Sequence, residues 1–255
     1  MKTLNYVLFA SLLIVLGCSD STIVDPVNPD NNINSILNKN SNAEMIKVFP
    51  AMKPITIDGL ENEWARAPKH KMRLEVDAGS PIENKDDLTS YFKMLWDEDN
   101  LYVFARIQDE DINVSGAELY EKDGLEIYID GGNYKRVGAN DFPPPNFTPA
   151  AYEDDVDFFR FIPGETSALS AYGIIDASSF EFAITETSNG YNVEVRMPFA
   201  DLPDFPAEAG HAFGVEFQTN DNDNGERQNF LKWNSALDES YFNPGLFGTA
   251  VLFKN

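Results

Sequence analysis

Short runs in which apolar and polar residues alternate recur along most of this chain. The clearest run spans residues 191–197, where Tyr, Val, Val and Met occupy the odd positions and Asn, Glu and Arg the even ones. Because successive side chains of a strand point to opposite faces, this run predicts an antiparallel strand with one buried face. Its partner is expected at residues 180–187, because Ser188-Asn189-Gly190 can form a tight hairpin turn. Further alternating runs lie at residues 55–57, 91–96, 101–108, 124–130, 158–162, 212–219, 230–233 and 247–253.

Helical periodicity is nearly absent from the sequence. Only residues 61–67 could form a helical turn or two, ended by Pro68. The acidic segment 97–100 is expected to join the runs on either side of it in a second hairpin. The sequence therefore predicts an all-β fold, an antiparallel β-sandwich that is jelly-roll-like, and the roughly 210 residues involved suit a single domain.

The N-terminal segment carries a signal for export. Lys2 is followed by an apolar run at residues 6–16, which is too short to span a bilayer, and then by Gly17 and Cys18. A small residue before cysteine at this position is typical of a bacterial lipoprotein signal peptide, here residues 1–17. Cys18, the one cysteine of the chain, would then be the lipidation site, and no disulfide could form. An ordinary signal peptide is the alternative.

Residues 18–45 are rich in Asn, Ser, Asp and Pro and contain few large apolar residues. Such a composition cannot bury enough surface to become ordered, so it predicts a flexible, lipid-anchored linker. Residues 46–255 are expected to form the folded domain. The protein is therefore expected in the cell envelope, anchored by lipid, with the outer membrane and the cell surface as the expected places.

Charge limits the partners and activities of the chain. It has 42 Asp and Glu residues against 19 Lys and Arg, a net charge of −23. Such a charge repels nucleic acid and anionic glycans and leaves neutral ligands and divalent cations as partners. Neither His70 nor His211 lies beside a recognisable nucleophile motif, and with so many carboxylates a glycosidase-like pair arises by chance. The sequence therefore predicts a protein that is not an enzyme.

Six segments that occur in this order resemble the carbohydrate-binding module family 9 domain. They are ITIDGLENEW (residues 55–64), LWDEDNLYVFARIQDED (95–111), DGLEIYID (123–130), GYNVEVRMPFADL (190–202), FGVEFQTNDND (213–223) and NPGLFGTAVL (243–252). The likeness covers nearly all of the chain after residue 50. It implies a β-sandwich that holds a sugar between two aromatic rings, often the reducing end of a β-glucan or xylan chain.

The two ring positions of the family are tryptophans, and this chain differs at both. The first ring precedes an acidic strand, where this chain has Tyr120, and the second lies just before the closing proline motif, where it has Tyr241. Tyrosine can stack on the apolar face of a sugar and also donate a hydrogen bond, but its ring is smaller. Trp233 is a possible substitute for the second ring. For both tyrosines, packing within a hairpin is the alternative.

The resemblance also implies which polar residues contact sugar hydroxyls: Glu126, Arg160 and Gln218. Strand alternation sends Glu126 and Gln218 to the face opposite the apolar core. An arginine beside a carboxylate makes a rigid donor and acceptor pair for neighbouring hydroxyls. The same Arg160 and Glu126 could equally form a cross-strand salt bridge without any ligand.

Calcium is a further expectation from the resemblance, since the family binds calcium structurally. Three acidic clusters, at residues 97–100, 153–157 and 220–224, offer the oxygen ligands that calcium prefers. None matches an EF-hand loop, and each could be a solvated turn instead. The sequence therefore assigns no cofactor with certainty, and a structural calcium ion is the candidate.

The function expected is non-catalytic binding of a neutral oligo- or polysaccharide, by its chain end, with glycan-utilisation proteins as further partners. One alternative is a surface scaffold or assembly lipoprotein whose sugar site is vestigial, which the two tyrosines favour. Another is a haem-binding electron-transfer domain with axial ligands among Met94, Met197 and His211, although alternation favours the core for Met197. The proline-rich segment 131–152 predicts an extended loop that could overhang the site or dock a protein.

Overall fold

A computed structural model describes residues 45–77, 80–135 and 156–254. The expected signal peptide, almost all of the linker and most of segment 131–152 lie outside these residues. Within them the chain is almost entirely strands and loops, with a few single-turn 3₁₀ helices. None of the helices in the described ranges has the length and apolar character needed to cross a membrane.

The strands and 3₁₀ helices have the following bounds. The strands are β1 (Met45–Pro50), β2 (His70–Met72), β3 (Leu74–Asp77), β4 (Leu88–Trp96), β5 (Asn100–Asp109), β6 (Gly124–Asp130), β7 (Val156–Phe161), β8 (Leu169–Ser170), β9 (Glu181–Thr187), β10 (Gly190–Pro198), β11 (Ala212–Asp221), β12 (Asn229–Lys232) and β13 (Gly248–Leu252). The 3₁₀ helices are η1 (Trp64–Arg66), η2 (Leu119–Glu121), η4 (Ala177–Ser179), η5 (Phe199–Asp201) and η6 (Pro244–Leu246).

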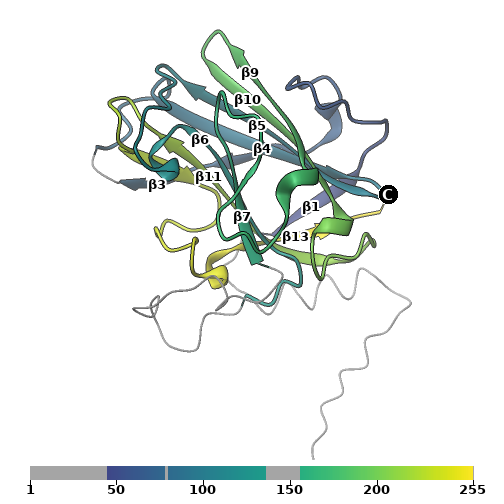
Figure 1. The fold of residues 1–255 in the computed structure, drawn as a ribbon. Helices are drawn as coiled ribbons and strands as arrows, with labels where there is room; N and C mark the ends of the chain where they lie inside the picture. Colours follow the sequence, from purple (N-terminus) through teal and green to yellow (C-terminus); the bar gives the residue numbers. More distant parts are fainter. Residues whose placement is uncertain (1–44, 78–79, 136–155, 255) are drawn as a thin grey trace, which may run out of the picture.

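The strands form two layers that share β1 (Figure 1). The first layer has the order β8-β7-β6-β11-β13-β1, and the second continues as β1-β4-β5-β10-β9. Residues 45–48 of β1 pair in parallel with β13, and residues 49–50 pair in parallel with β4. The other pairings within the described residues are antiparallel. The predicted all-β sandwich is therefore confirmed, with β1 as the strand that joins its two sheets.

The core between the two sheets follows from the alternation in the sequence. In β11, Phe213, Val215 and Phe217 point into it, and in β10 so do Val193 and Val195. The hairpin between β9 and β10 turns at Gly190, whose φ is +120°, a conformation that other residues rarely adopt. A Cβ there would also lie 2.2 Å from the carbonyl oxygen of residue 107. The hairpin predicted from Ser188-Asn189-Gly190 is therefore confirmed.

The methionines proposed as haem ligands pack in this core. Met197 is fully buried and Met94 is 2% exposed, both within the cluster between the sheets. His211 is part-buried, and its Nε2 lies 2.9 Å from the carbonyl oxygen of Gly131. Burial lowers the pKa of His211. Alternation thus gave the correct place for Met197.

The segment that contains the ITIDGLENEW motif is fastened to the outer face of the second sheet by Glu194. This carboxylate accepts hydrogen bonds from the indole Nε1 of Trp64 at 2.7 Å and from the backbone of Gly59 at 2.8 Å. The alternating run at 55–57 does not form a strand in the structure, and Ile55 packs beside Trp64 in a small separate cluster. The helical turn expected at 61–67 is shorter in the structure, where Trp64–Arg66 forms the single 3₁₀ turn η1.

Candidate functional site

A cavity of about 440 Å³ lies on the outer face of the first sheet, away from the core. It is lined by Tyr120, Glu126, Tyr128, Phe158, Arg160, Ala171, Tyr172, Gln218, Arg227, Asp238 and Tyr241. These residues come from β6, β7 and β11 and from the loops beside them. The cavity therefore combines the outer side chains of three adjacent strands with residues of four loop segments.

An aromatic surface forms one wall of the cavity. Tyr128 of β6 stacks on Phe158 of β7, with ring centroids 4.5 Å apart and an angle of 14° between the rings. Phe247 contacts Tyr128 edge-on, and Tyr172 contacts Phe158 edge-on. This outer cluster explains why every residue of β6 is buried, although alternation assigns only half of them to the core.

A charged pair lies beside this aromatic wall. Glu126 and Arg160 are directly opposite on β6 and β7, and Arg160 Nε donates to Glu126 Oε1 at 2.8 Å. Asn220 donates to the same oxygen at 3.1 Å, and the hydroxyl of Tyr128 donates to the other oxygen. Burial opposes ionisation of Glu126, but the charge of Arg160 and these hydrogen bonds outweigh it and lower its pKa. The cavity therefore presents a fixed carboxylate and a fixed guanidinium.

Gln218 completes the polar row on the sheet. It lies opposite Glu126 on β11, and its Nε2 donates to Asn220 Oδ1 at 2.7 Å. The amide is thereby oriented by its neighbour rather than free to rotate. Three polar side chains of different character thus follow one another across β7, β6 and β11.

Two tyrosines with large exposed areas stand at the rim of the cavity. Tyr120, in η2, is 42% exposed, and Tyr241, in the loop after β12, is 41% exposed. Both rings therefore have free surface that a ligand in the cavity could contact. Arg227 lies between their loops: its guanidinium is 5.3 Å from the ring of Tyr120 and forms an ion pair with Asp238 at 3.3 Å.

The loop that carries Tyr241 is anchored to the sheet by two buried charged residues. Glu216 accepts hydrogen bonds from the backbone of Trp233, Asn234 and Ser235 at 2.9–3.1 Å. Burial raises the pKa of Glu216 to about 7, although the positive charge of Lys232 and these bonds oppose that rise.

Lys232 anchors the far end of the same loop. It is fully buried, and its Nζ donates to the carbonyl oxygen of Leu237 at 2.7 Å and to the hydroxyl of Ser240. Burial lowers the pKa of Lys232. Ser240 directly precedes Tyr241, so the two anchors fix the backbone on either side of Asp238 and determine where the Tyr241 ring stands.

Five of the six predicted site residues thus line one cavity: Tyr120, Glu126, Arg160, Gln218 and Tyr241. The sixth, Trp233, is wrong as a substitute ring, because its side chain is 3% exposed and packs against Phe92 and Phe217 in the core. The salt bridge considered as an alternative for Arg160 and Glu126 does form, and it does so within the cavity.

Sequence reasoning missed the remaining lining residues. Tyr128 alternates outward beside Glu126, and this alternation was a usable signal for it. Arg227 and Asp238 lie in loops without any local pattern. Ala171 and Tyr172 line the cavity because Asp157 accepts hydrogen bonds from their loop. No pattern in the sequence predicts these long-range hydrogen bonds.

The sequence profile of the family described as "Carbohydrate family 9 binding domain-like" matches residues 57–255. The chain belongs to this family. Family 9 consists of carbohydrate-binding modules, so the resemblance of the six sequence segments and the β-sandwich are both accounted for.

Curated relatives of this family 9 chain contain the matching region as a small part of much longer proteins. The chain is 29% identical over 169 residues to endo-1,4-beta-xylanase A of Thermotoga neapolitana, which covers 65% of the chain and 14% of the xylanase. It is 28% identical over 199 residues to endo-1,4-beta-xylanase A of Thermotoga maritima, covering 78% and 17%. The match therefore says nothing direct about xylanase activity in this chain.

Two solved structures of a family 9 module from Caldicellulosiruptor kristjanssonii share the fold. One is a complex with cellotriose, with a TM-score of 0.67, 22% identity, and coverage of 83% of this chain and 95% of that one. The other is a complex with glucose, with a TM-score of 0.66, 22% identity, and coverage of 82% and 96%. At this identity the likeness concerns the fold alone.

The acidic clusters expected to hold calcium differ in the structure. Asp97 accepts hydrogen bonds from the hydroxyl of Tyr102 at 2.6 Å and from the backbone of Asn100 at 2.8 Å, so it caps its own turn. In the second cluster, only 156–157 is described, and Asp157 holds the loop after β8. The cluster at 220–224 is the one that meets further carboxylates.

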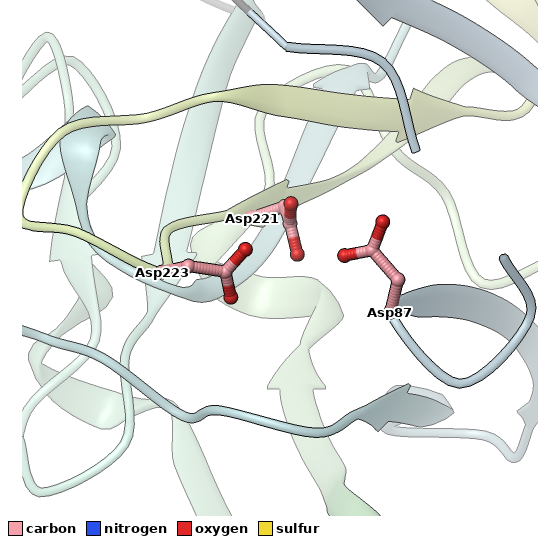
Figure 2. Close-up of side chains that lie close together, drawn as sticks. All are labelled: Asp87, Asp221 and Asp223. Carbon is pink, nitrogen blue, oxygen red and sulfur yellow. The ribbon is translucent and has the colours of Figure 1, made fainter. Parts of the chain in front are cut away.

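Carboxylates from four segments of the chain converge around Asp221. Oxygens of Asp109, Asp123 and Asp221 lie within 4.8 Å of one another, as do those of Asp87, Asp221 and Asp223. Figure 2 shows the second group, with the three carboxylates pointing toward a common centre. Asp221 belongs to both groups, so this cation cluster comprises five aspartates.

The cation cluster contains buried oxygens without hydrogen-bond partners. Both oxygens of Asp221, one oxygen of Asp109 and the hydroxyl of the fully buried Tyr191 have none. Burial, and then repulsion by Asp109, raises the pKa of Asp123 to about 9, and burial raises that of Asp221 to about 8. None of the described ion pairs gives these carboxylates a lysine or arginine partner. Oxygen ligands with unused lone pairs are what a calcium ion prefers, so the cluster fits calcium.

Proposed function

We propose that this protein is a non-catalytic module that binds the end of a neutral β-linked saccharide in the cavity between Tyr120 and Tyr241. The observation that carries the proposal is the cavity itself, in which exposed rings stand beside an oriented carboxylate, guanidinium and amide. A pyranose has an apolar C–H face and a fringe of hydroxyls, so it requires both kinds of surface. The cellotriose and glucose complexes of the similar modules support a β-glucan as the first saccharide to test.

The expected affinity is modest. Each hydrogen bond contributes about 0.5–1.5 kcal/mol, somewhat more with a charged partner. A few such bonds and two stacked rings, offset by the entropy lost on binding, give dissociation constants on the order of micromolar to millimolar. A module of this kind holds a glycan reversibly, which suits a protein that works beside glycan-degrading enzymes.

Replacing both Tyr120 and Tyr241 with alanine is expected to abolish saccharide binding. The measurement is affinity electrophoresis against β-glucans and xylans, followed by calorimetry with soluble oligosaccharides. Tyr134→Ala is the matched control, because Tyr134 is 47% exposed but does not line the cavity. If the double variant binds as well as the wild type, the proposed site is wrong. If the wild type binds no glycan at all, the vestigial-site scaffold replaces the proposal.

We infer that the protein is held at the cell envelope by a lipid on Cys18. The lysine, apolar run and Gly17-Cys18 pair support this inference. Cys18→Ser is expected to abolish incorporation of radiolabelled palmitate and to release the protein from the membrane fraction. Palmitate labelling that persists in Cys18→Ser would contradict it.

We also infer that the cation cluster holds calcium as a structural ion. Calcium at a hundredfold excess over its dissociation constant stabilises the folded protein by about 2.7 kcal/mol. It is therefore expected to raise the melting temperature by about 5–10 °C over that of the chelated protein. Asp221→Asn should lose this shift. Asp99→Asn, in the acidic turn that caps itself, should keep it. Identical melting in calcium and in EGTA would contradict the inference.

A further inference from the structure

The cation cluster and the rim of the cavity are joined by one buried side chain, Asn222. Its backbone N–H donates to Asp123 Oδ1 at 2.8 Å, and its side-chain Nδ2 donates to the carbonyl oxygen of Glu121 at 2.5 Å. Glu121 directly follows Tyr120 in η2. Two hydrogen bonds therefore connect a carboxylate of the cluster to the backbone beside the first ring.

Asn222 also holds the second element that touches Tyr120. Its Oδ1 accepts a hydrogen bond from the backbone of Gly225 at 2.7 Å, in the turn that leads to Arg227. The guanidinium of Arg227 lies over the Tyr120 ring. One amide thus fixes both the backbone that carries the ring and the turn that carries the cation packed against it.

The position of Asn222 depends directly on the cluster. It stands between Asp221 and Asp223 in the chain, and both are candidate ligands. A bound cation would bridge the carboxylates of Asp123 and Asp221, whose oxygens lie within 4.8 Å of one another, and so add to the hydrogen bond that joins residue 222 to Asp123. With a cation the same carboxylates are drawn together, which favours the arrangement in which Asn222 reaches Glu121.

The cluster is also accessible from outside. Asp109 lines a second cavity of about 480 Å³, between the end of β5 and the β9–β10 turn. That cavity is polar and includes Glu110 and Glu186 among its lining residues, so it offers a cation an acidic entrance. A divalent ion could therefore enter and leave without opening the saccharide cavity.

We propose that occupancy of the cation cluster sets the position of Tyr120 through Asn222 and so controls affinity for saccharide. The proposal rests on the proposed function for its saccharide readout. Coupling of this kind is reciprocal: if calcium strengthens saccharide binding by a given factor, saccharide strengthens calcium binding by the same factor. Typical couplings correspond to about 5–150-fold.

The test compares the full chain, Asn222→Ala and Asn243→Ala by calorimetry, with calcium or EGTA present. Asn243 caps η6 and does not touch the cluster, so it is the matched control. Wild type and Asn243→Ala are expected to bind cellotriose at least about fivefold more tightly with calcium. Asn222→Ala should still bind calcium, but its cellotriose affinity should be weak and independent of calcium. Equal cellotriose affinity of the wild type in both conditions would overturn the proposal.

Hydrogen exchange of residues 118–123 gives a second readout that needs no saccharide. Calcium is expected to slow exchange there in the wild type and to leave it unchanged in Asn222→Ala. Unchanged exchange in the wild type overturns the coupling even if saccharide binds. Slowed exchange without any cellotriose binding supports the coupling and instead contradicts the proposed function.

Discussion

Arg160→Met is expected to destabilise the protein by about 3–5 kcal/mol and to abolish saccharide binding. Glu126 is 1% exposed, so removing its guanidinium partner leaves a buried carboxylate without a counter-charge. The remaining bonds from Tyr128 and Asn220 keep the effect toward the lower end of this range. Urea unfolding measures the stability, and calorimetry measures the saccharide affinity.

The control is Arg196→Met, which removes an ion pair with Glu181 on an exposed part of the second sheet. Exposed pairs contribute under about 1 kcal/mol, so this variant should be nearly as stable as the wild type and should bind saccharide normally. Equal stability losses in the two variants would show that the Glu126–Arg160 pair has no special role.

The stability loss in Arg160→Met should depend on pH. In the wild type the pKa of Glu126 lies below its ordinary value of 4.5, so the pair stabilises the fold fully above that value and loses this contribution as pH falls through the lowered pKa. In the variant, burial without Arg160 raises the pKa of Glu126, and protonation relieves the buried charge. The difference in unfolding free energy between the two proteins should therefore be largest near neutral pH, begin to shrink as pH falls through the raised pKa of the variant, above 4.5, and go on shrinking down to the lowered pKa of the wild type.

Asp157→Ala is expected to have the second large effect, a loss of at least about 3 kcal/mol. Asp157 is 1% exposed and accepts hydrogen bonds from the hydroxyl of Ser170 at 2.7 Å and from the backbone of Ile174 and Ile175 at 3.0–3.1 Å. Without the carboxylate the buried N–H of Ile175 and the part-buried donors of Ser170 and Ile174 lose their acceptor. Urea unfolding measures the loss.

Saccharide affinity should fall together with stability in Asp157→Ala, because the loop that it holds carries two lining residues of the cavity. Asp176→Ala is the control in the same segment: Asp176 is exposed and accepts a hydrogen bond only from the backbone of Ser178 among the bonds described. It should change stability and affinity little. If Asp157→Ala matches this control, the carboxylate does not organise the loop.

Local pattern predicted the hairpins and the core. The β9–β10 hairpin was predictable because alternation and Gly190 act within a dozen residues of one another. Strand β1 was missed because it has no turn partner in sequence: its pairings are parallel, with β13 about 200 residues away and β4 about 46 residues away. Non-local parallel pairing leaves no signature in a short window.

The site was predictable only where the family resemblance indicated which residues, far apart in the sequence, lie close together in the fold. Nothing local relates Tyr120 to Tyr241, and the structure brings both to one cavity. Trp233 was misplaced because a tryptophan at the end of a strand can lie on either face of the sheet. Here its ring packs in the core, and its backbone N–H donates to the carboxylate of Glu216. Lys232 was missed because a lysine in an acidic protein is expected at the surface.

The cation cluster shows the same limit. Residues 220–224 were recognisable as acidic, but Asp87, Asp109 and Asp123 come from separate segments. An EF-hand places its ligands within one loop, whereas this cluster assembles them across the fold. Asp123 directly precedes β6, which pairs with β11, whereas Asp87 and Asp109 lie beside the paired ends of β4 and β5 in the second sheet, so the packing of the two sheets brings them together.

The central claim is that a sugar ring is held between Tyr120 and Tyr241 and hydrogen-bonded to Glu126, Arg160 and Gln218. A crystal structure of the protein with cellotriose tests it most directly. We expect one terminal glucose in this cavity, with its apolar face on at least one of the two tyrosine rings and its hydroxyls on the Glu126–Arg160 pair. Cellotriose bound elsewhere on the molecule, with this cavity empty, would contradict the account.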